Sequence, residues 1–294
     1  WAVAVTDFVQ AGIIVFSFIF MFINISRVSG GLNVVFEKVD KSLFTFFPKE
    51  RDLISWLKYL ESWIIVGLGS LGAQDLVGRL VAAKNVKIAR WSSVIGGIMY
   101  WVIGMIPVTF GILATVLLTE VNNESVLISL SMKYLPVPLM SLMVGGLLSA
   151  IMSSVDSAML APASIIGNNI VPYFIKNVTE EQKLFWCKIS VPIIGVGSLI
   201  IALYFKNIYA LCLESWTVLL TSITAPLIFA VFWKKTTATS TIFASVIGFL
   251  TWIIGKIFLG ENIPTRLFGF VASCVTVFIV SIFSSEKKKE IKQF

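Results

Sequence analysis

The sequence contains no histidine, and this absence removes several kinds of chemistry. Histidine is the usual ligand of haem and zinc and the usual side chain of a proton relay. The three cysteines lie in or beside apolar segments without paired spacing, so they indicate neither disulfides nor a metal site. A phosphate-binding loop, a zinc motif, a nucleophile elbow and a pair of catalytic carboxylates are also missing. We therefore do not expect an enzyme.

Charge is scarce as well. Charged residues make up 13% of the 294 residues, whereas 57% are apolar, and the mean hydropathy is +0.92. This composition excludes an ordinary soluble domain and a disordered chain. The apolar runs are continuous and about 20 residues long, whereas a membrane β-barrel would show short alternating segments. We therefore predict an all-α, polytopic membrane protein whose surroundings are a lipid bilayer.

Eight apolar segments are expected to cross the membrane. They are residues 1–24, 53–77, 91–118, 137–165, 184–205, 208–233, 240–259 and 267–283. We expect them to form one transmembrane domain, residues 1–285, followed by a charged tail, residues 286–294. Because the first residue is Trp1 and no signal peptide precedes the first span, the chain is expected to be a fragment without its natural start.

Basic residues give the expected orientation. The segments after the second, fourth, sixth and eighth spans carry 13 of the 23 Lys and Arg. Six of the other 10 lie in or just beyond the long loop after the first span, where acidic residues offset them. In membrane proteins, segments rich in Lys and Arg lie in the cytoplasm. The prediction is a multi-pass protein of the cell membrane with a cytoplasmic C-terminus. The formal net charge of +7 is thus explained by topology, and no nucleic-acid partner is expected.

A dense polar cluster interrupts the fourth span, within GGLLSAIMSSVDSAMLAPASIIGNNIVPY at residues 145–173. It consists of Ser149, Ser153, Ser154, Asp156 and Ser157. A carboxylate at the centre of a membrane helix costs roughly 2.5–3.5 kcal/mol, and each hydroxyl there needs a partner. Two interpretations stay open from the residues alone. Small residues permit close helix packing, and the same hydroxyls suit ion or solute binding.

Polar groups occur in two earlier spans. Thr6, Asp7 and Gln10 share one side of the first span, which indicates either an ion pathway or an interfacial start of the helix. The second span holds four glycines between residues 67 and 78, and each weakens a helix by about 1 kcal/mol relative to Ala. Such glycines indicate close packing, with Asp75 paired to Arg79, or a broken helix that builds a solute site.

The sixth span also begins with polar residues. Glu214 and Trp216 stand near its start, and Thr221, Ser222 and Thr224 lead down to Pro226. A carboxylate beside an aromatic ring can attract a cation. Trp is also ordinary at a membrane interface, and the interfacial interpretation is the one we favour for Glu214.

The polar stretch of the fourth span, extended to Phe174, resembles the sodium:solute symporter family. Members carry a small–x–x–Ser–Ser/Thr run in this helix, followed by small polar residues. WAVAVTDFVQ at residues 1–10 is similar to the family's V-x-x-T-D-x-x-Q helix, and AQDLVGR followed by LVAAKN is similar to a span ending in Arg. FWKKTTATSTIFASVIGFL at residues 232–250 fits the entry to a late helix. SSVDSAML is similar to the high-affinity choline transporters and their bacterial relatives.

The resemblance implies a five-plus-five inverted-repeat transporter fold. The chain would hold the last helix of the first repeat, the five helices of the second and two additional helices. It also implies sodium-coupled symport of a small organic solute by alternating access, with sodium as the co-transported ion. A cationic or zwitterionic solute such as choline is the expected class. The alternative on the same fold is a membrane sensor or regulatory domain, although residues after Ser285 leave no room for a signalling module.

The resemblance also implies positions for the sites. Sodium would be bound by the backbone carbonyl of Ala150 and the hydroxyls of Ser153 and Ser154. The remaining ligands would come from N-terminal helices that this chain lacks. Asp7 matches an acid that the family links to sodium coupling. The solute-contact region of the broken helix matches Gly72, Ala73, Gln74 and Asp75. No role is implied for Asp156.

Overall fold

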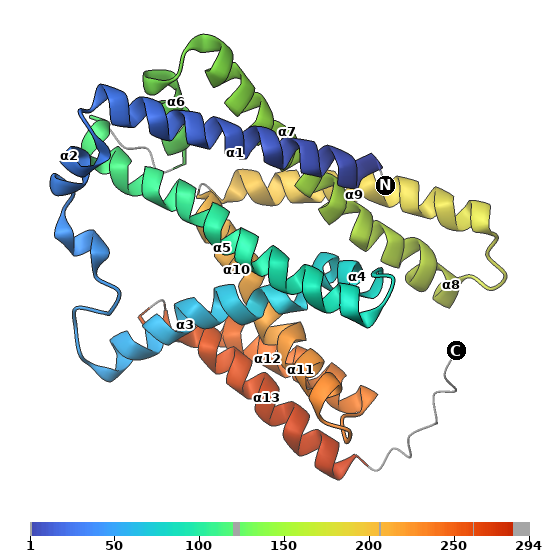
Figure 1. Cartoon of the computed structure of the whole chain (residues 1–294). Coiled ribbons are helices and arrows are strands. Elements are labelled where there is room, and N and C mark those ends of the chain that lie inside the picture. Colours follow the sequence, from blue (N-terminus) through green and yellow to red (C-terminus); the bar gives the residue numbers. More distant parts are fainter. Residues whose placement is uncertain (1, 120–123, 206, 261, 285–294) are drawn as a thin grey trace. The chain divides into compact units, whose positions relative to one another are not determined.

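A computed structural model describes residues 2–119, 124–205, 207–260 and 262–284, without the side chains of residues 2–7, Asp75 and Arg79. The predicted tail, residues 286–294, lies outside this part. All regular elements of the described residues are helical (Figure 1), as the composition predicts. Seven of the described helices are long and apolar enough to cross a membrane. The chain divides into two compact units, Trp1–Thr45 with Ala82–Tyr204, and Phe46–Val81 with Phe205–Phe294.

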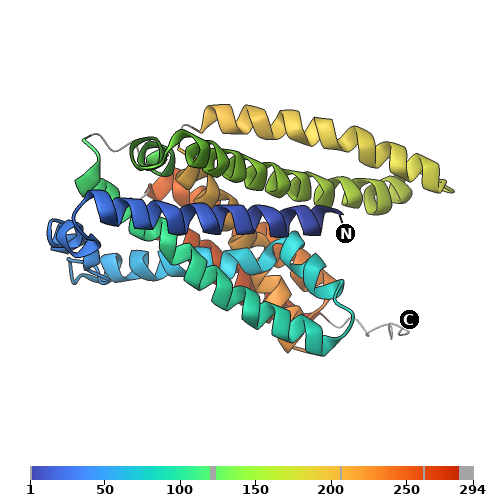
Figure 2. The ribbon, with the colours of Figure 1, turned by 45° about the horizontal axis from the view of Figure 1, so that its top comes forward.

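The first unit is built around the long helices α1, α7 and α9. Its elements are α1 (Ala2–Val28), α2 (Leu32–Glu37), η1 (Lys41–Phe44), α5 (Val86–Leu117), α6 (Val126–Tyr134), α7 (Val137–Ile165), η3 (Ile166–Ile170), α8 (Val171–Phe174) and α9 (Glu180–Tyr204). Figures 1 and 2 show α7 beside α1 and α9. Gly146 permits the contact with α1, because a Cβ there would lie 3.1 Å from the Cγ2 of Ile13.

The core of the first unit is apolar, and so is much of its surface. Met21 of α1, Phe110 of α5 and Met143 of α7 are fully buried together. Outward-facing side chains of α9, such as Ile193 and Leu203, are 66% and 75% exposed. In water such a surface would be an aggregation hazard, whereas in a bilayer it is the ordinary lipid-facing surface.

The second unit contains the segment predicted as the second span and the last three predicted spans. Its elements are α3 (Leu53–Gly69), η2 (Ser70–Gly72), α4 (Gln74–Val81), α10 (Ile208–Leu219), η4 (Leu220–Thr224), α11 (Ala225–Phe232), α12 (Ala238–Leu259) and α13 (Thr265–Phe283). Helices α12 and α13 pack closely along their length. The Ser273 hydroxyl donates to the Ala244 carbonyl at 3.1 Å, and the Ser281 hydroxyl donates to the Ser240 hydroxyl at 2.8 Å.

The sequence of α3 explains where this helix starts and stops. Asp52 caps its N-terminus by accepting from the backbone N–H groups of Ile54 and Ser55 at 3.2 and 3.3 Å. A side-chain hydrogen bond from Ser55, together with these backbone bonds, lowers the pKa of the exposed Asp52 carboxyl. The charged cap is therefore present at neutral pH and is lost as the pH falls through that lowered value. The helix ends in the glycines that follow Val66.

The segment predicted as the second span is a broken helix. After α3 ends at Gly69, η2 makes one tight turn, Ala73 is extended with φ −70° and ψ 126°, and α4 begins at Gln74. The break in this helix is thus confirmed, whereas its use as a solute site stays a prediction. The packing alternative holds for two of the glycines as well, because Gly69 and Gly72 are buried against η4 and the end of α10.

Among the described residues, two long helices contain a π-helical turn shortly before a proline. Turn η3 precedes Pro172 and joins α7 to α8, so the helical path continues beyond residue 165, where the fourth span was predicted to end. Turn η4 precedes Pro226 and joins α10 to α11. A π turn adds one residue to the helical register. This change helps the helix to accommodate proline, which has no backbone N–H to donate.

Candidate functional site

The predicted sodium ligands lie in the middle of α7. The Ser154 hydroxyl donates to the Ala150 carbonyl oxygen at 2.9 Å, so two of the three predicted ligands are in contact. Ala150 and Ser153 are half-buried, whereas Ser154 is exposed. A hydroxyl that donates its proton keeps two lone pairs, so Ser154 can still offer an oxygen to a cation. Carbonyl and hydroxyl oxygens are the hard ligands that a hard cation prefers.

The face of α7 that carries Ala150 and Ser154 borders an open hollow of about 450 Å³. Its lining is Leu147, Ala150, Ile151, Ser154, Val155 and Ala158. All six residues belong to α7, so within the described residues one helix supplies the whole lining. The Ala150 carbonyl and the Ser154 hydroxyl are the oxygens that such a surface offers to an ion. Ser153 is not part of this lining, and the assignment of sodium to Ala150, Ser153 and Ser154 stays a prediction.

A side-chain hydrogen bond joins α1 to α7 beside this region. Gln10 Nε2 donates to the Ser149 hydroxyl at 2.9 Å, one residue before Ala150. The other amide atom, Gln10 Oε1, is buried and has no hydrogen-bond partner among the described residues. The side chain of Asp7 is outside the described part, so its role in coupling stays a prediction. Asp156 is exposed, and the structure assigns it no contact that explains its presence.

The predicted solute-contact region lies at the break between α3 and α4. Gly72 is buried, Ala73 is half-buried and Gln74 is exposed. The side chains of Asp75 and Arg79 are not described, so the pairing expected between them stays a prediction. A helix that ends inside an apolar environment leaves carbonyls that other groups must satisfy.

Helix α10 and turn η4 carry a row of buried hydroxyls, and the last of them, that of Thr224, lies at this break. Thr217, Thr221 and Thr224 are all fully buried. The hydroxyls of Thr217 and Thr221 donate to carbonyls of their own helix, Leu213 at 2.7 Å and Thr217 at 2.9 Å. Thr224 also reaches another helix, because its hydroxyl lies 3.2 Å from the carbonyl oxygen of Leu68 in α3.

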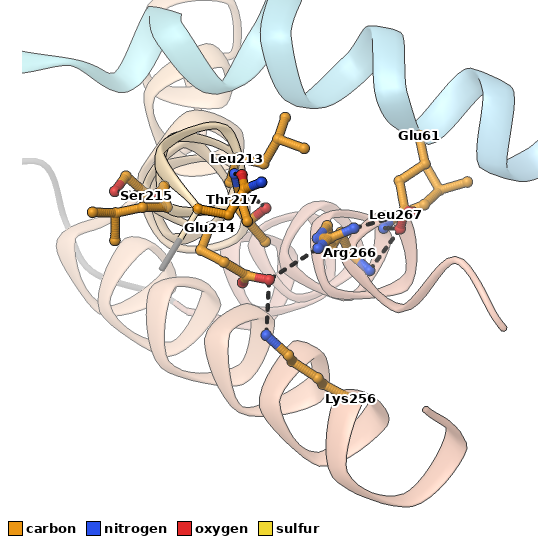
Figure 3. Close-up of polar contacts among 11 residues, drawn as sticks. Glu61, Leu213, Glu214, Ser215, Thr217, Lys256, Arg266 and Leu267 are labelled. Atoms are coloured by element: carbon orange, nitrogen blue, oxygen red, sulfur yellow. Dashed lines mark hydrogen bonds and ion pairs between the residues drawn. The ribbon is translucent and has the colours of Figure 1, made fainter. Parts of the chain in front are cut away.

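Four charged side chains from four helices meet in the second unit (Figure 3). Glu214 Oε1 of α10 accepts from Lys256 Nζ of α12 at 2.8 Å and from Arg266 Nη2 of α13 at 2.9 Å. Arg266 Nη1 lies 3.9 Å from Glu61 Oε2 of α3. The cluster contains two acids and two bases, so its net charge is zero. A buried group with a net charge would be costly, because its excess charge would have no partner.

Glu61 also caps a helix that begins 204 positions later in the sequence. Its Oε1 accepts from the backbone N–H groups of Arg266 and Leu267 at 2.9 and 3.1 Å. These two N–H groups belong to the first turn of α13, whose N-cap residue, Pro264, supplies no side-chain bond. A carboxylate at a helix N-terminus satisfies free N–H groups and complements the helix dipole.

Sequence reasoning missed three members of this cluster, Glu61, Lys256 and Arg266. It treated Glu214 as interfacial or as one half of a cation site with Trp216, whereas the structure pairs its carboxylate with two basic side chains of the same chain. The available signal was the lone acid in the apolar run SWLKYLESWIIVG. An ionisable residue inside a span predicts a partner elsewhere in the bundle.

Together these features define a class of protein. The chain has multiple apolar helices, one helix broken against a π turn, and a second helix with carbonyl and hydroxyl oxygens at its middle. Broken helices of this kind are typical of secondary transporters. The family model described as "Sodium:solute symporter family" matches residues 1–248, and the chain belongs to this family of multi-pass membrane transporters.

Individual relatives agree with this assignment. The osmoregulated proline transporter OpuE of Bacillus subtilis (strain 168) is 25% identical in an alignment 306 residues long, which covers 98% of this chain and 60% of OpuE. The high-affinity proline transporter PutP of the same organism is 26% identical in an alignment 308 residues long, which covers 99% of this chain and 63% of PutP. This chain therefore spans about three fifths of the length of these relatives.

A solved structure is similar in fold. It shows a Na⁺-coupled sialic acid symporter in a substrate-bound outward-open state and has a TM-score of 0.78 to this chain. The identity is 16%, and the match covers 96% of this chain and 62% of that one. The expected fold class, part of an inverted-repeat transporter of helical membrane spans, is thereby confirmed.

Proposed function

We propose that the protein transports a small organic solute together with sodium, by alternating access across the cell membrane. The observation that carries this proposal is the contact between the Ala150 carbonyl and the Ser154 hydroxyl on an open face of α7, in a chain of the symporter family. Residues 1–285 act as one transmembrane domain, with the C-terminus in the cytoplasm. This orientation follows the distribution of Lys and Arg.

Sodium is the co-transported substrate in this proposal, and Ala150, Ser153 and Ser154 are its ligands. The ion favours solute binding only as far as both prefer the same conformation of the protein. Asp7 contributes to the coupling from α1. Support for this role comes from Gln10, three residues further along α1, whose amide donates to Ser149 directly beside the ligands.

The break between α3 and α4 is the proposed solute-contact region, formed by Gly72, Ala73, Gln74 and Asp75. A broken helix presents the carbonyl end of one half and the N–H end of the other half. The first attracts a cationic group and the second an anionic group. A zwitterionic solute suits this arrangement, and two relatives are named as proline transporters.

A competition panel identifies the solute. Uptake by the full-length protein is measured in vesicles with an imposed sodium gradient, against proline, a betaine, choline, a monosaccharide and sialic acid. We expect a zwitterionic or cationic solute to compete and the monosaccharide not to compete. Sodium-dependent solute binding without any uptake would instead support the sensor alternative.

Ser153→Ala and Ser154→Ala test the sodium site. Each removes one hydroxyl oxygen, so the sodium concentration for half-maximal uptake is expected to rise roughly tenfold, as a polar bond to a charged group is worth about 1.5–3 kcal/mol. Ser164→Ala is the matched control. Ser164 stands on the same helix, and its hydroxyl accepts from Asn168 Nδ2 at 3.1 Å, away from Ala150. Unchanged sodium dependence in both test variants contradicts the assignment.

A further inference from the structure

The hydroxyl of Thr224 lies between two carbonyl oxygens of two different helices. It is 3.2 Å from the Leu68 carbonyl, near the end of α3, and 3.1 Å from the Leu219 carbonyl, at the end of α10. A hydroxyl has one proton to donate. Thr224 is fully buried, so the two carbonyls share this donor in a place that water does not reach.

The Leu68 carbonyl lies at the end of α3, where the regular helix stops, and it accepts the backbone N–H of the C-cap residue Ser70. A carbonyl oxygen has a second lone pair, so a further donor can bind it. The Gly67 carbonyl takes the Ser70 hydroxyl at 3.3 Å, a bond within the break itself. The Leu68 carbonyl also accepts a hydrogen bond from the Thr224 hydroxyl of η4, 156 positions away in the sequence. Thr224 therefore adds a hydrogen bond to this break from another helix.

The backbone on both sides of η2 lies directly on α10 and η4. A Cβ at Gly69 would stand 2.7 Å from the Trp216 carbonyl oxygen, and a Cβ at Gly72 would stand 3.2 Å from the Thr224 hydroxyl oxygen. The contact at Gly69 leaves no room for a side chain, whereas the contact at Gly72 is tight and a side chain there would have to displace Thr224 by a few tenths of an ångström. The path of the chain from Gly72 to Gln74 thus follows the surface that η4 presents.

The second carbonyl that Thr224 contacts is set by the π turn. Leu219 precedes Thr224 by five residues, which is the π-helical spacing, and Pro226 follows two residues later. A π turn is a local change of helical register and is frequent at functional sites. A change in this register would move Thr224 relative to Leu219. The Thr224 hydroxyl would then donate more often, or less often, to the Leu68 carbonyl.

We propose that Thr224 is a positioning residue whose shared hydroxyl couples the π turn of α10–α11 to the geometry of the break at Gly72–Gln74. It thereby sets the affinity of that region for the solute. The link to solute affinity rests on the proposed function, whereas the coupling to the break does not.

The transport test compares two buried threonines of the same helix. Thr224→Val keeps the shape and removes the hydroxyl, and Thr224→Ser keeps the hydroxyl. Loss of one buried hydrogen bond is expected to raise the solute concentration for half-maximal uptake by about three- to tenfold. The sodium concentration for half-maximal uptake, measured at saturating solute, stays within about twofold in this proposal. Thr224→Ser restores the wild-type value, and Thr224→Ala shifts in the same direction as Thr224→Val.

Thr217→Val is the matched control. Thr217 is also fully buried, but its hydroxyl donates to the Leu213 carbonyl of its own helix. We expect this variant to keep the wild-type solute dependence. Equal shifts in Thr217→Val and Thr224→Val, or a failure of Thr224→Ser to restore the value, would overturn the proposal, because either result would indicate a general effect on the helix.

A labelling test measures the break without transport. The exposed Gln74 is replaced by cysteine in the full-length protein after Cys187, Cys212 and Cys274 are changed to serine. The rate of modification by a methanethiosulfonate reagent is expected to change at least about threefold with Thr224→Val and not with Thr217→Val. Identical rates in both variants sink the proposal even where uptake is normal. A changed rate in a protein that shows no sodium-dependent uptake keeps the coupling and refutes the proposed function.

Discussion

Arg266→Met is expected to lower the free energy of unfolding by about 3 kcal/mol or more, because it removes one partner from a buried charge cluster. The guanidinium lies between Glu61 and Glu214, whose side chains are only 8% and 14% exposed. Without it, Glu61 keeps two backbone N–H donors and Glu214 keeps Lys256. Two carboxylates then face a single base. The 25% exposure of Arg266 places the effect at the lower end of the range for buried pairs.

Denaturant unfolding in detergent micelles measures this effect, with Lys183→Met as the control. Lys183 also forms an ion pair, at 2.6 Å to Glu180, but Glu180 is 85% exposed. Loss of such a surface pair is expected to cost less than about 1 kcal/mol. The double variant Arg266→Met with Glu214→Gln is expected to recover part of the loss, because it removes the excess negative charge. Similar losses for the Arg266 and Lys183 variants would contradict the buried character of the cluster.

Hydropathy predicted the positions of the helices well because each span is a local property of the chain. Helix α7 covers Val137–Ile165, the residues predicted for the fourth span, and α12 and α13 begin within two residues of their predicted starts. The glycines after Val66 also limited the second span to a few alternatives, and one of them was a broken helix. Length, apolar composition and helix-breaking residues were sufficient for these predictions.

Partners between distant helices could not be predicted in the same way. The bonds of Glu61 and Thr224 join residues 205 and 156 positions apart. Helical periodicity indicates that a polar residue occupies one side of a helix, but it does not indicate which other helix faces that side. Glu61 was the only acid in its run, and its partner is partly the backbone of α13, which no side-chain pattern marks.

The candidate sodium site could be predicted in part, because it combines a local contact with a function that spacing does not reveal. Ala150 and Ser154 are separated by four residues, so one helical turn brings them together, and the structure shows this contact. Whether the hydroxyls serve packing or an ion could not be decided from spacing. The resemblance to a family supplied the ion, and the open face of α7 is the structural feature that fits it.

A single methyl group at Gly248 is expected to have the second large effect. Its hypothetical Cβ would overlap the backbone carbonyl oxygen of Thr221 and stand 2.7 Å from the Ser273 Cβ and 3.0 Å from the Gly269 carbonyl oxygen. Two of these three atoms are backbone, so no side-chain rotation relieves the overlap. Helices α12 and α13 and turn η4 would have to separate. We expect Gly248→Ala to lower the free energy of unfolding by about 1–3 kcal/mol despite the higher helix propensity of alanine.

Gly197→Ala in α9 is the matched control for this substitution. Apart from its chain neighbours and the adjacent backbone of α9, no atom of the described residues lies within 4 Å of a Cβ at Gly197, so the better helix propensity of alanine acts alone. Its stability is expected to be equal to wild type or higher by up to about 1 kcal/mol. Gly248→Ala should therefore lower the unfolding midpoint, whereas Gly197→Ala should keep or raise it. Comparing the two midpoints with wild type is enough to show this difference. Because Thr221 and Thr224 both belong to η4, Gly248→Ala should also weaken solute affinity, whereas Gly197→Ala should leave it unchanged. Equal stability of the two variants would show that α12 and η4 can separate freely, and the coupling assigned to Thr224 would then lack a rigid support.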